Sequence, residues 1–212
     1  MPYGFLDIAA TPSVKAAQEA NGSRVLFEDF AGERAFDRLG PAEAAYIAER
    51  DSFFMASVSE TGWPYVQHRG GPPGFLRVLD ETTLAFADFR GNRQYISLGN
   101  IAANGRVALI LMDYPNRRRM KLYARIEARD LAGDPALALM LALDGYRAKV
   151  ERAFVLSLEA FDWNCAQHIT PRYTQGQIDA ALGPFRARMA ALEAENQTLR
   201  ARLAETANGD PS

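Results

Sequence analysis

Short apolar runs separated by turn residues dominate the middle of the chain. Runs with the composition of β-strands lie at residues 53–59, 63–69, 75–79, 84–87, 107–113, 117–128 and 152–161. Turn signals at 61–62 (Thr-Gly) and 80–82 (Asp-Glu-Thr) separate the early runs. Because the connections are mostly short, the pattern predicts antiparallel strands that close into a barrel.

Helical signals flank and interrupt these strands. A short helix is predicted from Pro12, which suits a first helical turn, to Gly22, which ends it. A second helix is expected at 41–50, and a third at 134–143, where an Asp-Pro pair forms the start. The chain is therefore expected to be mainly β with helices, in the α+β class.

The C-terminal tail carries a different pattern. Thr174 and Gln177 have the spacing of a capping box at the start of a helix over 175–205. Within this helix the apolar positions follow a heptad. The a positions are Leu182, Met189, Asn196 and Leu203, and the d positions are Phe185, Leu192 and Leu199.

The charges beside this heptad suit pairing with a second copy. In a parallel homodimer Arg188 faces Glu193, and Glu195 faces Arg200, so both pairs attract. A buried Asn196 also favours two parallel strands in register. The alternative is an amphipathic helix packed on the chain's own barrel, and we favour the coiled coil between chains.

The net charge of −2 and the lack of a long basic block argue against nucleic acid as the main partner. No apolar run approaches the roughly 20 residues of a membrane span. The N-terminus also lacks the basic start and apolar core of a signal peptide. We therefore expect a cytoplasmic protein with neither a nucleic-acid nor a membrane partner.

Cys165 is the only cysteine, which excludes a disulfide within the chain. No oxyanion-hole motif accompanies it, so we interpret it as a small packed residue rather than a nucleophile. The only two histidines, His68 and His168, have no recognisable metal-ligand spacing with the carboxylates. We expect no metal site.

The most informative stretch is FADFRGNRQYISLGNIAANGRVALIL at 86–111. An apolar strand breaks there into a loop that carries Arg90, Asn92, Arg93 and Gln94 and then enters a helix. Gly91 permits a tight turn, and guanidiniums, amides and the N–H groups of a helix N-terminus together favour an anion such as phosphate. Taken alone, the stretch also fits a solvated connection. No dinucleotide fingerprint or P-loop motif is present.

Three segments, HRGGPPGF (68–75), FRGNRQYISLGNIAAN (89–104) and DWNCAQHITPR (162–172), occur in an order that resembles the pyridoxamine 5′-phosphate oxidase-like flavoproteins. The resemblance covers about residues 52–172. It implies an antiparallel split barrel and a homodimer that holds FMN at the subunit interface. Together with the helical signals on either side of it, the resemblance divides the chain into a helical extension (1–50), an FMN-binding barrel (51–172) and a coiled-coil helix with a disordered end (173–212).

The resemblance also implies roles for individual residues. Arg93 matches the arginine of the family's Ser-Arg-Lys motif, so it is the first choice for the FMN phosphate. Asn92 and Gln94 stand where the motif has serine and lysine. The implied cofactor-binding residues are Arg69, Gly70, Gly71, Arg90, Asn92, Arg93, Gln94, Arg119, Lys121, Trp163, Asn164 and Gln167.

The implied activity is that of an FMN-dependent oxidoreductase, in which the flavin performs hydride transfer and no catalytic side chain is required. A small-molecule substrate, with NAD(P)H as a candidate, is expected beside His68, His168 and Arg172. The substrate-holding arginine and histidine of true pyridoxamine phosphate oxidases are not recognisable at their usual spacing, so vitamin B6 oxidation is not expected. The alternative function is a flavin- or haem-binding carrier or sensor without turnover.

Overall fold

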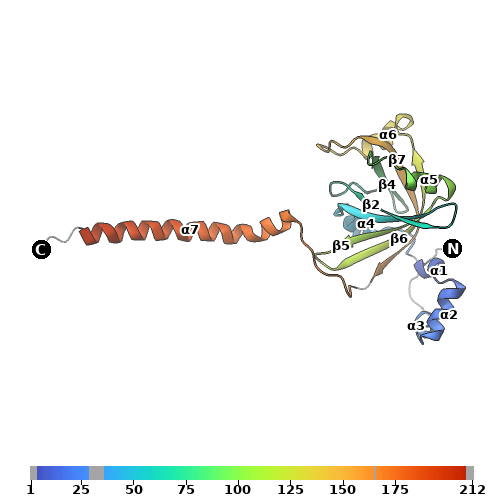
Figure 1. Cartoon of the computed structure of the whole chain (residues 1–212), viewed down its shortest axis with the longest axis horizontal. Coiled ribbons are helices and arrows are strands. Elements are labelled where there is room, and N and C mark those ends of the chain that lie inside the picture. Colours follow the sequence, from blue (N-terminus) through green and yellow to red (C-terminus); the bar gives the residue numbers. More distant parts are fainter. Residues whose placement is uncertain (1–3, 29–35, 165, 209–212) are drawn as a thin grey trace. The chain divides into compact units, whose positions relative to one another are not determined.

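The computed structural model describes residues 4–28, 36–164 and 166–208. The chain divides into two compact units, Met1–Ile169 and Thr170–Ser212. The helices of the first unit are α1 (Phe5–Ala9), α2 (Pro12–Ala20), α3 (Val25–Glu28), α4 (Pro41–Ala48), α5 (Ile96–Ala103), the 3-10 turn η1 (Leu131–Gly133) and α6 (Pro135–Met140) (Figure 1). Its strands are β1 (Ser52–Val58), β2 (Pro64–Gly70), β3 (Arg77–Val78), β4 (Thr83–Phe89), β5 (Arg106–Asp113), β6 (Arg118–Arg129) and β7 (Val150–Asn164).

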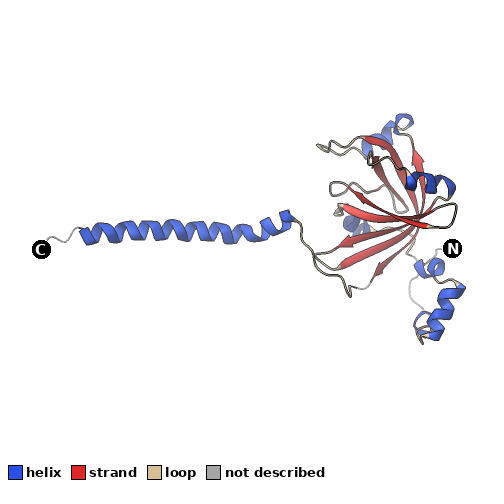
Figure 2. Ribbon diagram, viewed as in Figure 1, coloured by secondary structure: helices blue, strands red, loops and turns tan. Residues whose placement is uncertain are grey.

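All seven strands belong to one antiparallel sheet in the order β2-β1-β5-β6-β7-β4-β3. Figure 2 shows the strands curving around a shared interior. The order leaves β2 and β3 as the two edges of the sheet. The prediction of an antiparallel split barrel in the α+β class is therefore confirmed.

Aromatic rings fill the interior of the barrel. Phe53 stacks on Phe75 at 5.5 Å between ring centroids and meets Phe86 edge-on at 5.2 Å. Phe154 lies 5.3 Å from Phe86, and all four side chains are buried. Buried and half-buried residues alternate along β5, as the period of two predicts for a strand with one face in the core.

Two predicted strands differ from the observed ones. The run at 75–79 contributes only Arg77–Val78 as a strand, because Phe75 and Leu76 follow the left-handed Gly74 (φ 80°) and reach the core from a turn. The last strand is longer than the predicted 152–161 and runs on to Asn164. Its extension pairs with the start of β6, where Trp163 lies opposite Met120.

The second unit consists mainly of α7 (Gln175–Asn208), a single helix. Its predicted capping box is confirmed. The Thr174 N–H donates to Gln177 Oε1 at 2.9 Å, and the Gln177 N–H donates to Thr174 Oγ1 at 3.2 Å. Of the described helices, none is long and apolar enough to cross a membrane. The predicted disordered end at 209–212 lies outside the described residues.

Candidate functional site

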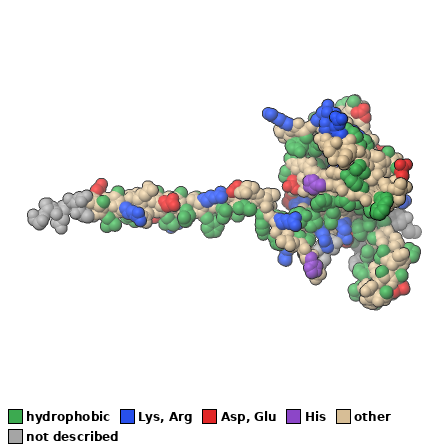
Figure 3. All heavy atoms as spheres, viewed as in Figure 1, with side chains coloured by type: hydrophobic (Ala, Val, Ile, Leu, Met, Phe, Trp, Pro, Cys, Tyr) green, Lys and Arg blue, Asp and Glu red, His purple; other side chains and the backbone are tan. Residues whose placement is uncertain are grey.

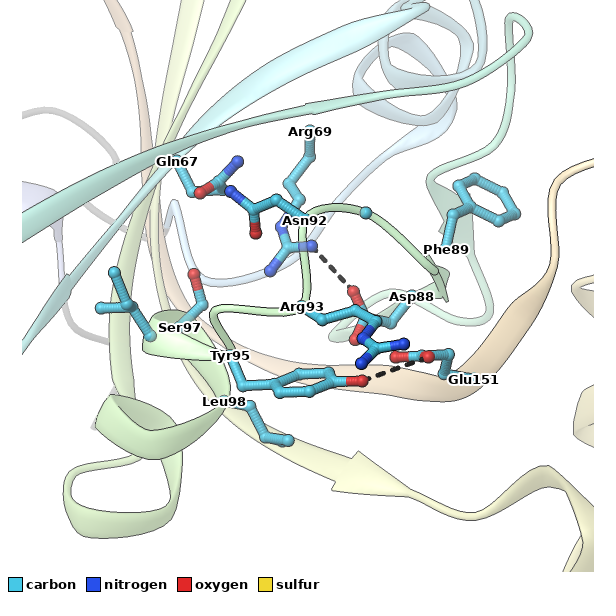
Figure 4. A pocket seen from close by; sticks show the side chains of 12 residues that line it. Gln67, Arg69, Asp88, Phe89, Asn92, Arg93, Tyr95, Ser97, Leu98 and Glu151 are labelled. Carbon is cyan, nitrogen blue, oxygen red and sulfur yellow. Dashed lines mark hydrogen bonds and ion pairs between the residues drawn. The ribbon is translucent and has the colours of Figure 1, made fainter.

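The arginine-rich loop after β4 borders a pocket of about 170 Å³, between the edge strand β2 and the start of α5 (Figure 4). The pocket is lined by Gln67, Arg69, Asp88, Phe89, Gly91, Asn92, Arg93, Tyr95, Ile96, Ser97, Leu98 and Glu151. These residues come from β2, from the end of β4, from the following loop, from α5 and from β7.

The backbone of the loop positions these side chains. The register between β4 and β7 shifts at Asp88 and Phe89, a β-bulge that redirects the chain as it leaves the sheet. The left-handed turns then fall on Arg93 (φ 62°) and Tyr95 (φ 53°). Gly91 does not have a positive φ, so the left-handed residues of this loop are an arginine and a tyrosine rather than a glycine.

The first turn of helix α5 borders the pocket. It begins at Ile96, and the pocket lining includes Ser97 and Leu98. Within the described chain, no side chain caps this helix end. Uncapped N–H groups and the helix dipole favour an anion there. Asn100 fixes the helix by donating from Nδ2 to the Ser57 hydroxyl of β1 at 3.0 Å.

Arg69 bridges the split in the barrel. Its Nη1 lies 2.7 Å from Asp88 Oδ1 on β4, and its guanidinium lies 5.5 Å from the Phe154 ring centre. Arg152 Nε approaches the other oxygen of Asp88 at 3.5 Å. The buried Arg69 Nε has no hydrogen-bond partner among the described residues. A buried donor without a partner is costly, which suggests that a ligand atom satisfies it.

Glu151 organises the other wall of the pocket. Its carboxylate accepts from Arg90 Nε at 2.8 Å and from the Tyr95 hydroxyl at 3.2 Å. Arg152 Nη2 lies 3.2 Å from the same carboxylate. The Arg93 side chain is exposed at this wall and makes no hydrogen bond or ion pair with the described part of the chain. Four guanidiniums against two carboxylates leave an excess of positive charge.

The two carboxylates have opposite pKa shifts. Burial raises the pKa of Asp88 above its ordinary value, although Arg69 and Arg152 act against the rise. The hydrogen bond from Arg90 lowers the pKa of Glu151 below its ordinary value. As the solution becomes acidic, Asp88 is therefore expected to take up its proton at a higher pH than an ordinary aspartate, and Glu151 at a lower pH than an ordinary glutamate.

These pKa shifts predict how the free energy of unfolding should depend on pH in two variants. Just above the ordinary Asp pKa, folded Asp88 keeps a proton that the unfolded chain has lost, so its contribution to the free energy of unfolding falls as pH rises. Asp88→Asn should remove this fall. Glu151 has the opposite effect, because its contribution to the free energy of unfolding is lost as pH falls through its lowered pKa. Glu151→Gln should remove this loss. Urea unfolding between about pH 3 and 6 measures the free energy of unfolding of each variant as a function of pH. If both variants kept the pH dependence of the wild type, the pKa shifts assigned to Asp88 and Glu151 would be wrong.

Part of the predicted cofactor set meets at this pocket. Arg69, Asn92 and Arg93 line it, and Arg90 borders it through its ion pair with Glu151. Gln94 lies next to the pocket, where its N–H donates to Asn92 Oδ1 at 3.1 Å. The predicted assembly of guanidiniums, amides and a helix N-terminus is thus present within one chain.

Gly70 and Gly71 lie away from the pocket and are held by packing within the chain. A Cβ on Gly71 would meet the Phe75 ring at 2.7 Å, and a Cβ on Gly70 would lie 3.5 Å from the Asp51 carbonyl oxygen. The Gly71 N–H donates to that same oxygen at 2.9 Å. The Phe75 side chain therefore leaves no room for a Cβ on Gly71, whereas a Cβ on Gly70 would lie 3.1 Å from His68 Cε1. Contact of either glycine with a flavin stays a prediction.

Arg119 and Lys121 lie on the outer face of β6, away from the pocket. Lys121 lies 3.5 Å from Asp162 and over the Phe5 ring. The buried Arg119 Nε has no hydrogen-bond partner in the described chain. Both residues share one strand face, as predicted, and their role toward a cofactor stays a prediction.

Trp163 packs beside helix α4 rather than in the pocket. Its Nε1 donates to Glu43 at 3.1 Å, and its ring meets Tyr46 edge-on at 4.7 Å. The Arg118 guanidinium lies over both rings. Gln167 is exposed. The side chain of Asn164 and the whole of Cys165 lie outside the described residues. Within one chain, this late segment is not brought to the Arg93 pocket.

Of the three substrate-pocket candidates, His68 and His168 belong to the first unit and Arg172 to the second. His68 lies on β2 with its ring 5.5 Å from Phe54, on the opposite side of the strand from Arg69. His168 is exposed with a left-handed backbone (φ 63°), and Arg172 belongs to the second unit. The part of the chain that the structure describes holds no group of three His, Cys, Asp or Glu side chains suited to a metal ion.

The sequence did not point to several lining residues. Gln67, Asp88, Tyr95, Ser97 and Glu151 became candidates only through the fold. Ser97 carries the clearest signal in retrospect, because a hydroxyl in the first turn of a helix after an arginine-rich loop is well placed for a phosphate. Glu151 lies 58 residues beyond Arg93, and only the pairing of β4 with β7 brings them together.

Comparisons with known proteins found a family model and several solved structures that are similar to this chain. A family model described as pyridoxamine 5′-phosphate oxidase matches residues 39–149, whereas no curated protein matches the sequence. A solved FMN-binding protein from Syntrophomonas wolfei is 14% identical with a TM-score of 0.46, over 72% of this chain and 95% of its own.

Two further structures show similar values. HupZ from Group A Streptococcus is 14% identical with a TM-score of 0.46, over 64% of this chain and 99% of its own. General stress protein 26 from Bacillus anthracis is 10% identical with a TM-score of 0.43, over 56% and 88%. The family model spans more than half of the 212 residues, and the chain therefore belongs to the pyridoxamine 5′-phosphate oxidase family.

Proposed function

We propose that this protein is an FMN-dependent oxidoreductase whose pocket at Arg69 and Arg93 holds the FMN phosphate. The buried, unpartnered Nε of Arg69 carries the proposal. The exposed guanidinium of Arg93 and the uncapped start of α5 support it, because a phosphate that leaves water needs several charged or oriented donors. The donor set therefore fits a phosphate monoester.

The size of the pocket limits what one chain holds. Pockets that enclose a whole small-molecule ligand measure about 300–1,000 Å³, whereas this one measures about 170 Å³. The phosphate end fits it, and the ring system requires further surface. We propose that a homodimer supplies that surface. The outer face of β1, β2, β5 and β6 is a candidate interface, because Phe54, Val66 and Ile110 line a second, largely apolar pocket there.

Bound FMN would supply the hydride chemistry, so the chain needs no nucleophile of its own. Arg93 and Arg69 would bind the phosphate, and the Ser97 hydroxyl and the first N–H groups of α5 would orient it. Glu151 holds Arg90 and Tyr95 in place at the pocket wall. Each of these roles binds or orients, and none requires a proton transfer by the protein.

Absorbance and anaerobic reduction test the function. The full-length protein loaded with FMN should show a bound flavin spectrum, and mixing it with NADH or NADPH without oxygen should bleach that spectrum rapidly. A bound but unreactive flavin would support a carrier or sensor instead. Absence of flavin binding, or binding of haem alone, would overturn the proposal.

Pyridoxamine 5′-phosphate itself is expected to be a poor substrate. Its phosphate would need cationic partners of its own, yet His68 lies across β2 from Arg69 and His168 is exposed. Oxidation by the FMN-loaded protein under air should stay far below the roughly 1–1000 per second typical of enzymes on their own substrates. Turnover within that range would show that other residues hold the substrate.

A further inference from the structure

Helix α7 exposes a continuous apolar row. Its large apolar side chains are each at least 40% exposed: Ile178, Leu182, Phe185, Met189, Leu192, Leu199 and Leu203. Figure 3 shows hydrophobic side chains recurring along the length of this helix. Most of the stability of a helix in a protein comes from burial of its apolar face. We therefore expect this apolar row to be buried against another surface.

The spacing of the row specifies the kind of partner. With Asn196 included, the positions from 178 to 203 are separated by alternating steps of four and three residues, so every two steps span one heptad of seven. A helix with this period keeps its apolar seam facing another helix over several turns when the two supercoil. The partner surface is therefore a second helix with the same repeat.

The helix is also intrinsically weak near its start. Gly176, Gly183 and Pro184 lie inside it or in its first turn, and each lowers the helix propensity of an isolated segment. Pro184 occupies a c position of the heptad, which faces away from the seam. Pairing is compatible with this proline and offsets the weakness that it introduces.

We propose that residues 178–203 of α7 form a parallel, in-register, two-stranded coiled coil with the same helix of a second copy. Asn196 fixes the orientation, because it is the only polar residue in the row. In a parallel pair it meets Asn196 of the second copy, whereas in an antiparallel pair its amide lies among apolar side chains without a partner. The pairs Arg188 with Glu193 and Glu195 with Arg200 are attractive in the parallel register.

This pairing would act on the first unit through the covalent connection between the two units. Two chains joined at α7 present their barrels to each other at a high effective concentration, which is millimolar for short flexible connections. A barrel interface too weak to form between separate molecules would then be populated. The coiled coil is independent of the proposed flavin chemistry, and its failure would leave that proposal standing.

Disulfide trapping of the full-length chain tests the orientation. In a Cys165→Ser background, Leu199→Cys places the only thiol at a d position, and Ala201→Cys places it at an f position two residues away as the matched control. A parallel, in-register pair brings d to d′, so the Leu199→Cys variant should crosslink at least tenfold faster than the Ala201→Cys variant. Equal rates, or no crosslink in either variant, would overturn the proposal.

The charge pairs provide a second readout. In the Leu199→Cys background, Glu195→Arg places like charges opposite Arg200 and should slow crosslinking about two- to tenfold. Adding Arg200→Glu should restore the rate. Glu205→Arg makes the same chemical change at a c position and should leave the rate unchanged. A double variant no faster than Glu195→Arg alone would show that the helices do not pair in this register.

Discussion

Arg93→Ala is expected to weaken FMN binding about ten- to a hundredfold. A charge-assisted contact to phosphate contributes roughly 1.5–3 kcal/mol, which corresponds to that range. Arg93 lines the pocket without a partner in the described chain, so the substitution should break no ion pair there. Titration of the protein with FMN, followed by flavin fluorescence, measures the change in dissociation constant.

Arg117→Ala is the matched control for this variant. Arg117 is also exposed and also left-handed (φ 53°), but it lies in the turn between β5 and β6, away from the pocket. It therefore reproduces the backbone strain of an alanine at such a position without the loss of a phosphate ligand. Arg93→Lys should recover part of the affinity, since it keeps the charge but not the fork of donors. Equal dissociation constants for Arg93→Ala and wild type would remove Arg93 from the site.

Phe154→Ala should destabilise the barrel strongly. The ring is fully buried between Phe86 and the guanidinium of Arg69, and alanine would leave a cavity at that place. Such truncations cost about 3–5 kcal/mol. For a unit of this size the melting temperature should fall by roughly 6–20 °C, which calorimetry or thermal circular dichroism would detect.

Trp63→Ala provides the contrast. Its side chain is 76% exposed in the turn before β2, so its loss should change stability by no more than about 0.5 kcal/mol. If both variants melt within a degree or two of the wild type, Phe154 does not pack in the core as described. A large loss for both would instead assign a structural role to the exposed Trp63.

Local patterns were sufficient to predict most of the elements. Short apolar runs between turn residues located the strands, and the capping box at Thr174 located the start of α7. The pattern failed at Phe75, where a buried apolar pair resembles a strand but enters the core from a turn. A run of apolar residues indicates that the residues are buried, but burial alone does not distinguish a strand from a well-packed turn.

The site was predictable where it is contiguous in sequence. Arg93 and Asn92 lie within one loop, and their chemistry is visible without the fold. The roles of Asp88 and Glu151 were not, since a carboxylate beside an arginine-rich loop has no local signature. They depend on a strand register and on the split of the barrel, both of which are set by tertiary packing.

The left-handed backbone at Arg93 and Tyr95 has a consequence for directed evolution. A non-glycine residue in this conformation is disfavoured by roughly 1–2 kcal/mol. A library selected only for heat resistance would therefore accumulate glycine or asparagine at both positions, whereas a library selected for a coloured, flavin-loaded product would retain arginine at 93. If the first selection removed arginine from position 93 and the second retained it, the stability of the loop and the binding of the flavin would favour different residues there.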